Sequence, residues 1–174
     1  MWVARRRARY RDRAGPLPEA TRAALAAFFP TPTLDAARLA VVPRIPGPPF
    51  LSLLRKAGLV AADFRRVVGM TFQDTIIVTE DLAGPALQAT LFHELVHVEQ
   101  ARQLGLAGFA RRYVEGWLEE GRYDRIPLER DAYELQRRFE RAPGVPFDVF
   151  AEVSARSVRV EGAGACDFSS RATR

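Results

Sequence analysis

The segment Leu91–Gln100 reads LFHELVHVEQ and decides the fold of this chain. It contains His93, Glu94 and His97 in the pattern H-E-x-x-H, and the chain's 2 histidines both lie here. On a helix, residues four positions apart lie one above the other on the same face, so both imidazoles can offer a nitrogen to one Zn²⁺. Glu94 lies to one side of that position, where it can accept a proton from a metal-bound water.

Apolar residues surround the motif on nearly every side of the expected helix. They are Leu91, Phe92, Leu95, Val96 and Val98. Such a helix belongs in the middle of a domain, where an unpaired Glu94 carboxylate and two unpaired imidazoles would be costly. We therefore favour a metal site over the alternative, in which His93 and His97 are structural histidines on a core helix.

The length and composition of the chain indicate one folded domain. Its 174 residues are 48% hydrophobic and 10% aromatic, which is enough to bury a core. Cys166 is the only cysteine, so we expect neither a disulfide framework nor a cysteine-based zinc site. No apolar run approaches the roughly 18 residues of a membrane span, and we expect a cytoplasmic protein.

Arginine dominates the N-terminal segment, MWVARRRARYRDRAG, and Lys56 is the only lysine of a chain with a net charge of +5. Gly15 and Pro16 follow the basic run where a signal peptide would have an apolar stretch, so we do not expect one. We predict a flexible basic arm at residues 1–15. Such an arm could contact nucleic acid or an acidic partner, but it is more often a solvated tail, and we do not favour nucleic-acid binding.

The residues before the motif predict a helix and a small sheet. We expect a helix at Pro18–Phe29, an edge strand within Ala37–Ile45 because that segment contains Pro43, and a short helix at Phe50–Ala57. The segment FRRVVGMTFQDTIIVTE predicts a hairpin that turns at Gln73-Asp74, with Thr75–Thr79 as its second strand. This strand comes just before the motif, and we expect an edge there on which an extended peptide can lie as an added strand.

The residues from the motif onward predict helices. Three are expected, at Pro85–Leu104, Phe109–Glu120 and Leu128–Arg141. Gly105 ends the first, and the inward-facing residues of the second are Phe109, Tyr113, Val114 and Trp117. Pro146–Val153 is expected to pack as a short helix or an extended segment. We predict a flexible tail at residues 154–174, a single domain at residues 16–153, and an α+β fold with a small mixed or antiparallel sheet packed on a helical bundle.

A catalytic zinc takes three protein ligands and leaves a position for water, so a third ligand is needed. Without another histidine or a nearby cysteine it must be a carboxylate. The downstream candidates are Glu115, Glu119, Glu120, Asp124, Glu129, Asp131 and Glu134. Glu129 stands in the first turn of the helix expected at Leu128–Arg141, where the helix dipole favours a carboxylate. Asp131 is about 200° further round that helix, so both cannot face one ion, and we choose Glu129 with Asp131 as the alternative.

The motif HELVHVEQ, followed by PLERDAYE, resembles the gluzincin type of zinc metallopeptidase, which carries H-E-x-x-H on one helix and a glutamate on a later one. It is most similar to small bacterial domains with an HEL-x-H-x-x-Q signature and a later E-x-[DE]-A segment, some of which occur in proteins tied to contractile injection systems. The resemblance covers about Val67–Phe139. It implies a zincin-like fold with zinc ligands His93, His97 and Glu129 and the general base Glu94. Larger gluzincins often have an Asp four positions after the third ligand, and this Asp orients a histidine. Tyr133 occupies that position in this chain, so Asp131 or a backbone carbonyl would orient the histidine instead.

The resemblance implies hydrolysis of a peptide bond in a peptide or protein substrate. Zinc would polarise the scissile carbonyl, and Glu94 would pass a proton from the metal-bound water to the leaving amine. The tetrahedral intermediate also needs a hydrogen-bond donor. Tyr133, one turn after Glu129 on the same face, is our first choice, before Tyr123 and Tyr113.

Two other functions fit the same residues. The three ligands could hold a structural or regulatory zinc in a non-catalytic domain, and Glu94→Gln would then leave the function intact. Alternatively, the arginine arm could be the active surface for nucleic acid or a protein partner, and binding would then fall steeply with salt.

Overall fold

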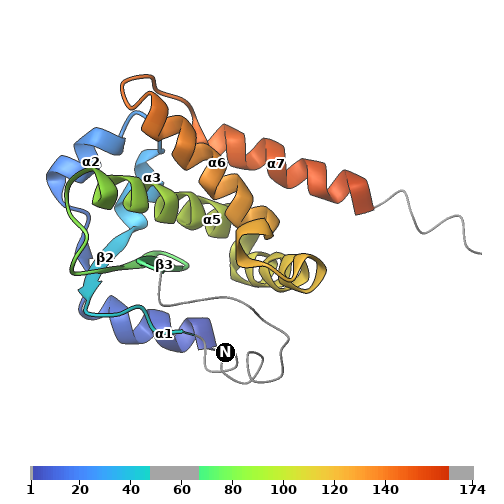
Figure 1. Cartoon of the computed structure of the whole chain (residues 1–174), viewed down its shortest axis with the longest axis horizontal. Coiled ribbons are helices and arrows are strands. Elements are labelled where there is room, and N and C mark those ends of the chain that lie inside the picture. Colours follow the sequence, from blue (N-terminus) through green and yellow to red (C-terminus); the bar gives the residue numbers. More distant parts are fainter. Residues whose placement is uncertain (1, 48–66, 165–174) are drawn as a thin grey trace, which may run out of the picture.

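The structure is a computed structural model that describes residues 2–47 and 67–164, with side chains up to residue 157. A small sheet and several helices pack around one long helix, α5 (Gly84–Glu120), as Figure 1 shows. The predicted mixture of α and β structure is thereby confirmed. The segment Phe50–Ala57, where we predicted a short helix, lies outside the described residues.

Four strands form the sheet, in the order β1-β2-β4-β3. β2 (Arg38–Val42) runs parallel to β4 (Thr75–Thr79), and β3 (Gly69–Phe72) pairs antiparallel with the other side of β4. β1 (Gly15–Pro16) adds a two-residue strand beside the start of β2. β3 and β4 are joined by a turn in which Gln73 has a φ of 66°, and this confirms the predicted hairpin.

The positions of two strands in the sheet correct our predictions about its edges. β4 is an interior strand, and the four residues Thr75–Val78 are all buried. Its alternate side chains enter different clusters, Ile77 on one face and Ile76 on the other, because helices cover both faces of this strand. β2 is interior as well, and Pro43 lies just beyond its end. The edge strand in contact with α5 is therefore β3.

Helix α1 (Trp2–Arg11) occupies most of the segment for which we predicted a flexible arm. The ring centroids of Trp2 and Tyr10 lie 5.5 and 6.0 Å from that of Phe72. Phe72 shares a cluster with Ile77, and Figure 1 shows α1 on the side of the sheet away from α5. Trp2 and Tyr10 thus give this arginine-rich helix an apolar face, which could not be recognised from its charge pattern.

Asp74, in the turn between β3 and β4, holds the charged side of α1. Arg7 donates two hydrogen bonds of 2.7 Å to the two oxygens of this carboxylate. Arg11 forms an ion pair of 2.7 Å with the same group. The Asp74 side chain is 16% exposed, so these contacts are partly shielded from solvent. The aromatic contacts with Phe72 and the charged contacts with Asp74 together explain why α1 packs on the sheet as a helix.

The segment between α1 and the sheet differs from its prediction in detail. α2 (Glu19–Leu25) ends before the expected Phe29, and an additional short helix, α3 (Thr31–Ala36), follows Pro30. The phenylalanines that follow α2 belong to an aromatic cluster at the centre of the core. Its members are Phe28, Phe29, Phe92, Phe139 and Phe147.

Helix α5 carries the motif and bends at Gly105, whose φ and ψ are 69° and 162°. The two helices predicted on either side of Gly105 are the two arms of this bent helix. In the first arm, every residue from 91 to 101 is buried. In the second arm only one face packs, and Val114, which we predicted to face inward, is 56% exposed.

Two further helices complete the fold. After the short turn η2 (Tyr123–Arg125), α6 (Pro127–Arg141) confirms the predicted helix and packs against α5. α7 (Val149–Gly164) is a helix where we predicted a flexible tail from residue 154, and residues 165–174 lie outside the described part of the chain. Arg156 of α7 explains part of this order, because it forms an ion pair of 3.2 Å with Asp131 of α6. Within the described ranges, the structure has no helix that is long and apolar enough to cross a membrane.

The contacts of Asp74 predict that Asp74→Ala loosens α1. The change leaves Arg7 and Arg11 without their carboxylate, and we expect a loss of about 1–3 kcal/mol in the free energy of unfolding. Urea denaturation measures this loss, and limited trypsin digestion should cut faster after the arginines of α1. Asp12→Ala is the control, because Asp12 is exposed and has no ion pair among the described residues. Equal digestion rates for the two variants would contradict the docking of α1 through Asp74.

Candidate metal centre

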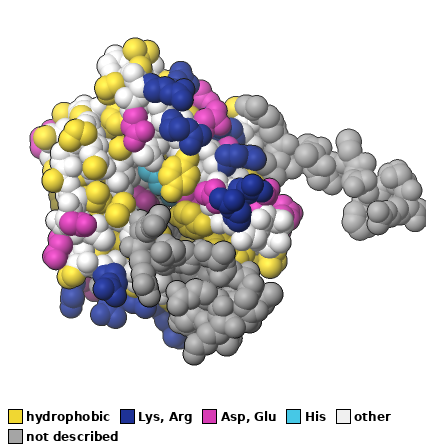
Figure 2. Space-filling view, in the orientation of Figure 1, with side chains coloured by type: hydrophobic (Ala, Val, Ile, Leu, Met, Phe, Trp, Pro, Cys, Tyr) yellow, Lys and Arg dark blue, Asp and Glu magenta, His cyan; other side chains and the backbone are white. Residues whose placement is uncertain are grey.

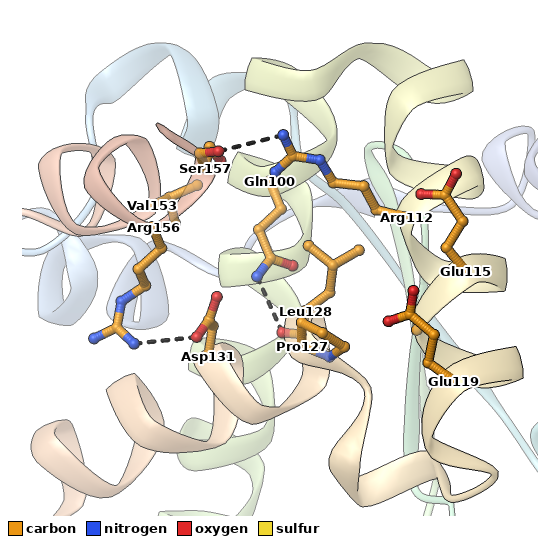
Figure 3. Close-up of a pocket in the computed structure, with 11 residues that line it drawn as sticks. Gln100, Arg112, Glu115, Glu119, Pro127, Leu128, Asp131, Val153, Arg156 and Ser157 are labelled. Carbon is orange, nitrogen blue, oxygen red and sulfur yellow. Dashed lines mark hydrogen bonds and ion pairs between the residues drawn. The ribbon is translucent and has the colours of Figure 1, made fainter. Parts of the chain in front are cut away.

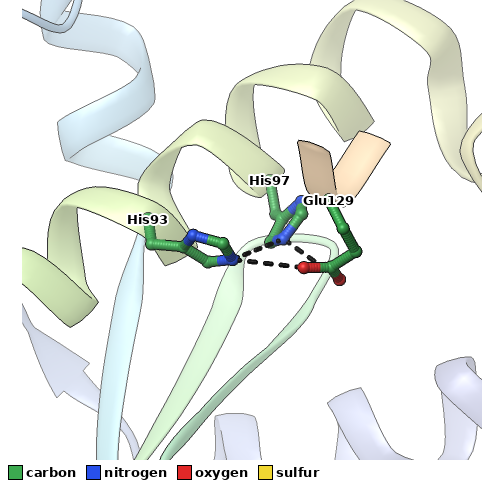
Figure 4. A group of neighbouring side chains, drawn as sticks. All are labelled: His93, His97 and Glu129. Carbon is green, nitrogen blue, oxygen red and sulfur yellow. Dashed lines mark hydrogen bonds and ion pairs between the residues drawn. The ribbon is translucent and has the colours of Figure 1, made fainter. Parts of the chain in front are cut away.

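The structure brings His93, His97 and Glu129 together, as Figure 4 shows. The two Nε2 atoms of the histidines lie 3.1 Å apart. Glu129 reaches them from the first turn of α6, with Oε2 at 3.3 Å from Nε2 of His93 and Oε1 at 3.4 Å from Nε2 of His97. These are the three ligands that we chose from the sequence.

The alternative third ligand, Asp131, does not belong to this group. Its carboxylate faces α7 and pairs with Arg156 at 3.2 Å. The remaining downstream candidates are exposed at the surface of the described structure. They are Glu115, Glu119, Glu120, Asp124 and Glu134. Glu129 is therefore the carboxylate that α6 presents to the histidines.

The spacing of the three side chains suits a tetrahedral ion. Ligand atoms about 2.0–2.1 Å from a tetrahedral zinc lie about 3.3 Å from one another. The observed separations of 3.1, 3.3 and 3.4 Å are close to that value. Two imidazoles and one carboxylate are also a donor set that zinc accepts, with a fourth position left for water.

Burial makes an unoccupied group of this kind costly. His93, His97 and Glu129 are 6%, 5% and 1% exposed. Oε2 of Glu129 is buried without a hydrogen-bond partner among the described residues. Buried polar atoms are nearly always paired, and a cation between the three side chains would supply the missing partner. The residues present thus fit a bound metal ion.

The charges of the group are coupled even without a metal. Burial disfavours the charged form of His97, but the adjacent Glu129 carboxylate outweighs this effect and raises the pKa of His97 to about 9. Burial likewise acts against the charged Glu129, but His97 and His93 reverse its effect and hold the pKa of Glu129 far below its ordinary value. A protonated His97 and an ionised Glu129 therefore stabilise each other where a metal would otherwise bind.

Glu94 lies beside this group and is held by the edge strand β3. The hydroxyl of Thr71 donates to Oε2 of Glu94 at 2.7 Å. A Cβ atom at Gly69 would lie 2.7 Å from Oε1 of Glu94 and 2.7 Å from the side chain of Thr90, so this position of β3 must lack a side chain. Thr71 and Gly69 could not be identified from the sequence, because only the hairpin fold places them against the motif.

Gln100 is the residue that orients His97. Its Oε1 lies 2.8 Å from Nδ1 of His97, on the opposite side of the ring from Glu129. We expected Asp131 or a backbone carbonyl in this role, and the structure corrects that expectation. The signal was available in the sequence, because Gln100 follows His97 by three positions and therefore lies on the same face of the helix.

The three candidate tyrosines differ in their surroundings. Tyr113 donates to Oε1 of Glu129 at 2.8 Å, and burial followed by the nearby carboxylate raises its pKa well above the ordinary value. Tyr123, in η2, has its ring 6.4 Å from that of Tyr113. The ring of Tyr133 lies 4.5 Å from that of His93, and its hydroxyl has no hydrogen-bond partner among the described residues. Burial raises the pKa of Tyr133 to about 12, so this phenol remains a donor at neutral pH.

The site reaches the surface on one side. Figure 2 shows a small area of histidine at the centre of the face that it presents. No protein-family model matches the chain, and no curated protein or solved structure matches it either. The candidate site is accordingly defined by the geometry and chemistry of its own residues.

The raised pKa of His97 predicts that zinc binding releases a proton. At pH 7 the ring of metal-free His97, whose pKa is about 9, carries an extra proton, whereas a zinc ligand must be neutral. We expect about one proton to leave per zinc bound, measured by calorimetry in buffers of different ionisation enthalpy. The apparent affinity should rise about tenfold per pH unit up to a pH of about 9 and level off above it.

Glu129→Gln provides the matched control for this proton release. It removes the carboxylate that raises the pKa of His97 while keeping the shape of the side chain. Any zinc that this variant still binds at pH 7 should release less than the proton released by the wild type. A binding enthalpy that does not depend on the buffer in the wild-type protein would contradict the coupling between His97 and Glu129.

Proposed function

We propose that this protein is a zinc-dependent peptidase of the minimal gluzincin type, with a zincin-like fold. The placement of Glu94 carries the proposal. Its carboxylate adjoins the histidines of the metal group and is anchored to β3 by Thr71. A structural zinc needs no proton acceptor beside its ligands, whereas hydrolysis by a metal-bound water does.

Glu94 would act as the general base. Zinc, when bound, lowers the pKa of a coordinated water and polarises the scissile carbonyl. Glu94 takes the proton of the attacking water and transfers it to the leaving amine. In the metal-free protein, burial raises the pKa of Glu94 above its ordinary value, although His93 and His97 oppose this effect.

The edge strand β3 would orient the substrate. Among the described residues its outer side has no strand partner, and its Thr71 contacts Glu94 directly. An extended peptide that pairs with this side of β3 would run past the general base and the metal group. We expected an extended peptide to pair with Thr75–Thr79, and we now propose that it pairs with Gly69–Phe72 instead.

Tyr133 is the best candidate for the donor to the tetrahedral intermediate. Tyr113 already donates a hydrogen bond to Glu129. Tyr133 is half-buried, its ring contacts that of His93, and its hydroxyl is uncommitted within the described part of the chain. We therefore assign to Tyr133 the hydrogen bond to the oxyanion of the intermediate. We assign to Tyr113 the hydrogen bond that orients the candidate ligand Glu129.

A non-catalytic zinc domain is the second candidate. It is favoured by the low exposure of His93 and His97, which are 6% and 5% exposed and leave little room for a large substrate. We do not propose nucleic-acid binding through the arginine arm. Arg7 and Arg11 of this arm are engaged with Asp74, whereas Arg5, Arg9 and Arg13 are exposed.

The proposal predicts that Glu94→Gln abolishes peptide hydrolysis while zinc stays bound. The amide keeps the size of the side chain but cannot accept the proton of the water, so we expect the rate to fall by at least about 10²–10⁴-fold. The measurement is the cleavage of a complex peptide mixture by zinc-loaded protein, followed by mass spectrometry.

Glu99→Gln is the matched control for that experiment. Glu99 is the other buried glutamate of α5, but its carboxylate accepts hydrogen bonds from Thr33 and Gln103 and lies away from the ligands. Cleavage should persist in this variant. If zinc-loaded wild type produces no peptide fragments beyond those of Glu94→Gln, the peptidase assignment fails and the non-catalytic domain takes its place.

A second prediction separates the two tyrosines. Tyr133→Phe removes only the uncommitted hydroxyl, so kcat should fall by about 10²–10³-fold with zinc affinity unchanged. Tyr113→Phe removes the hydrogen bond to Glu129, so zinc affinity should fall by about tenfold or more. Kinetics on a cleaved peptide and a zinc competition titration measure the two effects. The opposite pattern would exchange the roles that we give to these residues.

A further inference from the structure

The side chain of Gln100 joins two of the three candidate ligands. It is 2% exposed, and its Oε1 lies 2.8 Å from Nδ1 of His97. Its Nε2 donates to the backbone carbonyl of Leu128 at 3.0 Å, and Figure 3 shows the amide directed at this carbonyl. Leu128 immediately precedes Glu129 in α6, so one amide links the ring of one ligand to the backbone that carries another.

The partners of Gln100 fix the protonation pattern of the His97 ring. A backbone carbonyl can only accept, so the amide nitrogen of Gln100 faces Leu128 and the amide oxygen faces His97. This oxygen can also only accept, so Nδ1 of His97 must carry the hydrogen that it donates. In a neutral ring, Nε2 then keeps its lone pair. Nε2 is the atom that lies 3.1 Å from Nε2 of His93, on the side of the candidate metal.

His93 has no equivalent support. Its buried Nδ1 lacks a hydrogen-bond partner among the described residues, and its ring is instead held by contact with Tyr133 at a centroid distance of 4.5 Å. The two histidines are thus held in different ways. Only His97 is connected through a side-chain amide to α6.

We propose that Gln100 is a positioning residue that presets the metal site. It selects Nε2 as the atom that His97 presents, and it sets the position of α5 relative to the backbone of Glu129. This inference rests on the proposed zinc site. Glutamine is suited to both tasks. Glutamate accepts from Nδ1 but has no hydrogen for the carbonyl of Leu128, and methionine has no donor and only a weak sulfur acceptor.

The test compares the zinc affinities of three variants by competition with a chromogenic chelator. Gln100→Met should weaken zinc binding by about 10–100-fold, the usual scale for outer partners of a metal-bound histidine. Gln100→Glu should bind more tightly than Gln100→Met but more weakly than the wild type, because it restores only the contact with His97. Gln103→Met is the matched control, since it removes the same amide one turn further along α5, where it bonds to Glu99 and to the backbone of Phe150.

A second readout separates positioning from a general loss of stability. In the zinc-loaded protein, a buried and hydrogen-bonded Nδ1 hydrogen of His97 gives a slowly exchanging proton resonance. We expect this resonance in the wild type, in Gln100→Glu and in Gln103→Met, and its loss or rapid exchange in Gln100→Met. A role of Gln100 in stability alone would not single out this hydrogen.

The outcomes distinguish this inference from the proposed function. If Gln100→Met binds zinc as tightly as Gln103→Met and keeps the His97 resonance, the positioning role is overturned while the zinc site stands. If Gln100→Met does not fold, Gln100→Glu decides, because wild-type zinc affinity in that variant would overturn the link to Leu128. If the wild-type protein binds no zinc, the proposed function itself fails.

Discussion

The burial of three ionisable side chains at one point of an apolar core is the constraint on which the structure depends. His93, His97 and Glu129 lie within hydrogen-bonding or ion-pair distance of one another and are almost completely removed from solvent. Such a group is stable only if its members compensate one another's charge or share a cation. In the metal-free state a proton on His97 provides the compensation, and a divalent metal would replace that proton.

Polar contacts on two sides hold α5 in the core. On one side, α6 supplies Glu129 and receives the hydrogen bond of Gln100 at Leu128. On the other side, Glu99 accepts hydrogen bonds from Thr33 of α3 and from Gln103, which also contacts the backbone of α7. The aromatic cluster packs around Phe92 of α5. The contact of Gln100 with α6 reaches the candidate ligands, whereas the contacts of Glu99 and Gln103 tie α5 to α3 and α7 away from them.

The sequence predicts the parts of this arrangement that depend on local periodicity. The spacing of His93 and His97, the break at Gly105 and the helix that carries Glu129 all follow from helical geometry and capping, and the structure confirms them. The contacts of Thr71 with Glu94 and of Gln100 with Leu128 join residues 23 and 28 positions apart, and only the tertiary fold reveals them.

The predictions that needed correction share the same physical origin. The interior place of β4 depends on a parallel pairing with β2, which no local pattern encodes. Helix α1 is held by a carboxylate 67 positions away and by two aromatic rings among arginines, so its composition alone indicated a solvated arm.

The central claim, a zinc ion held by His93, His97 and Glu129, is tested most directly by native mass spectrometry of zinc-treated protein. We expect about one zinc per wild-type chain, its loss in His97→Ala and its partial loss in Glu129→Gln. Asp131→Asn should keep the full zinc content, because Asp131 faces Arg156. A wild-type chain that carries no zinc, or a site that loses its metal only when Asp131 is changed, would contradict the account.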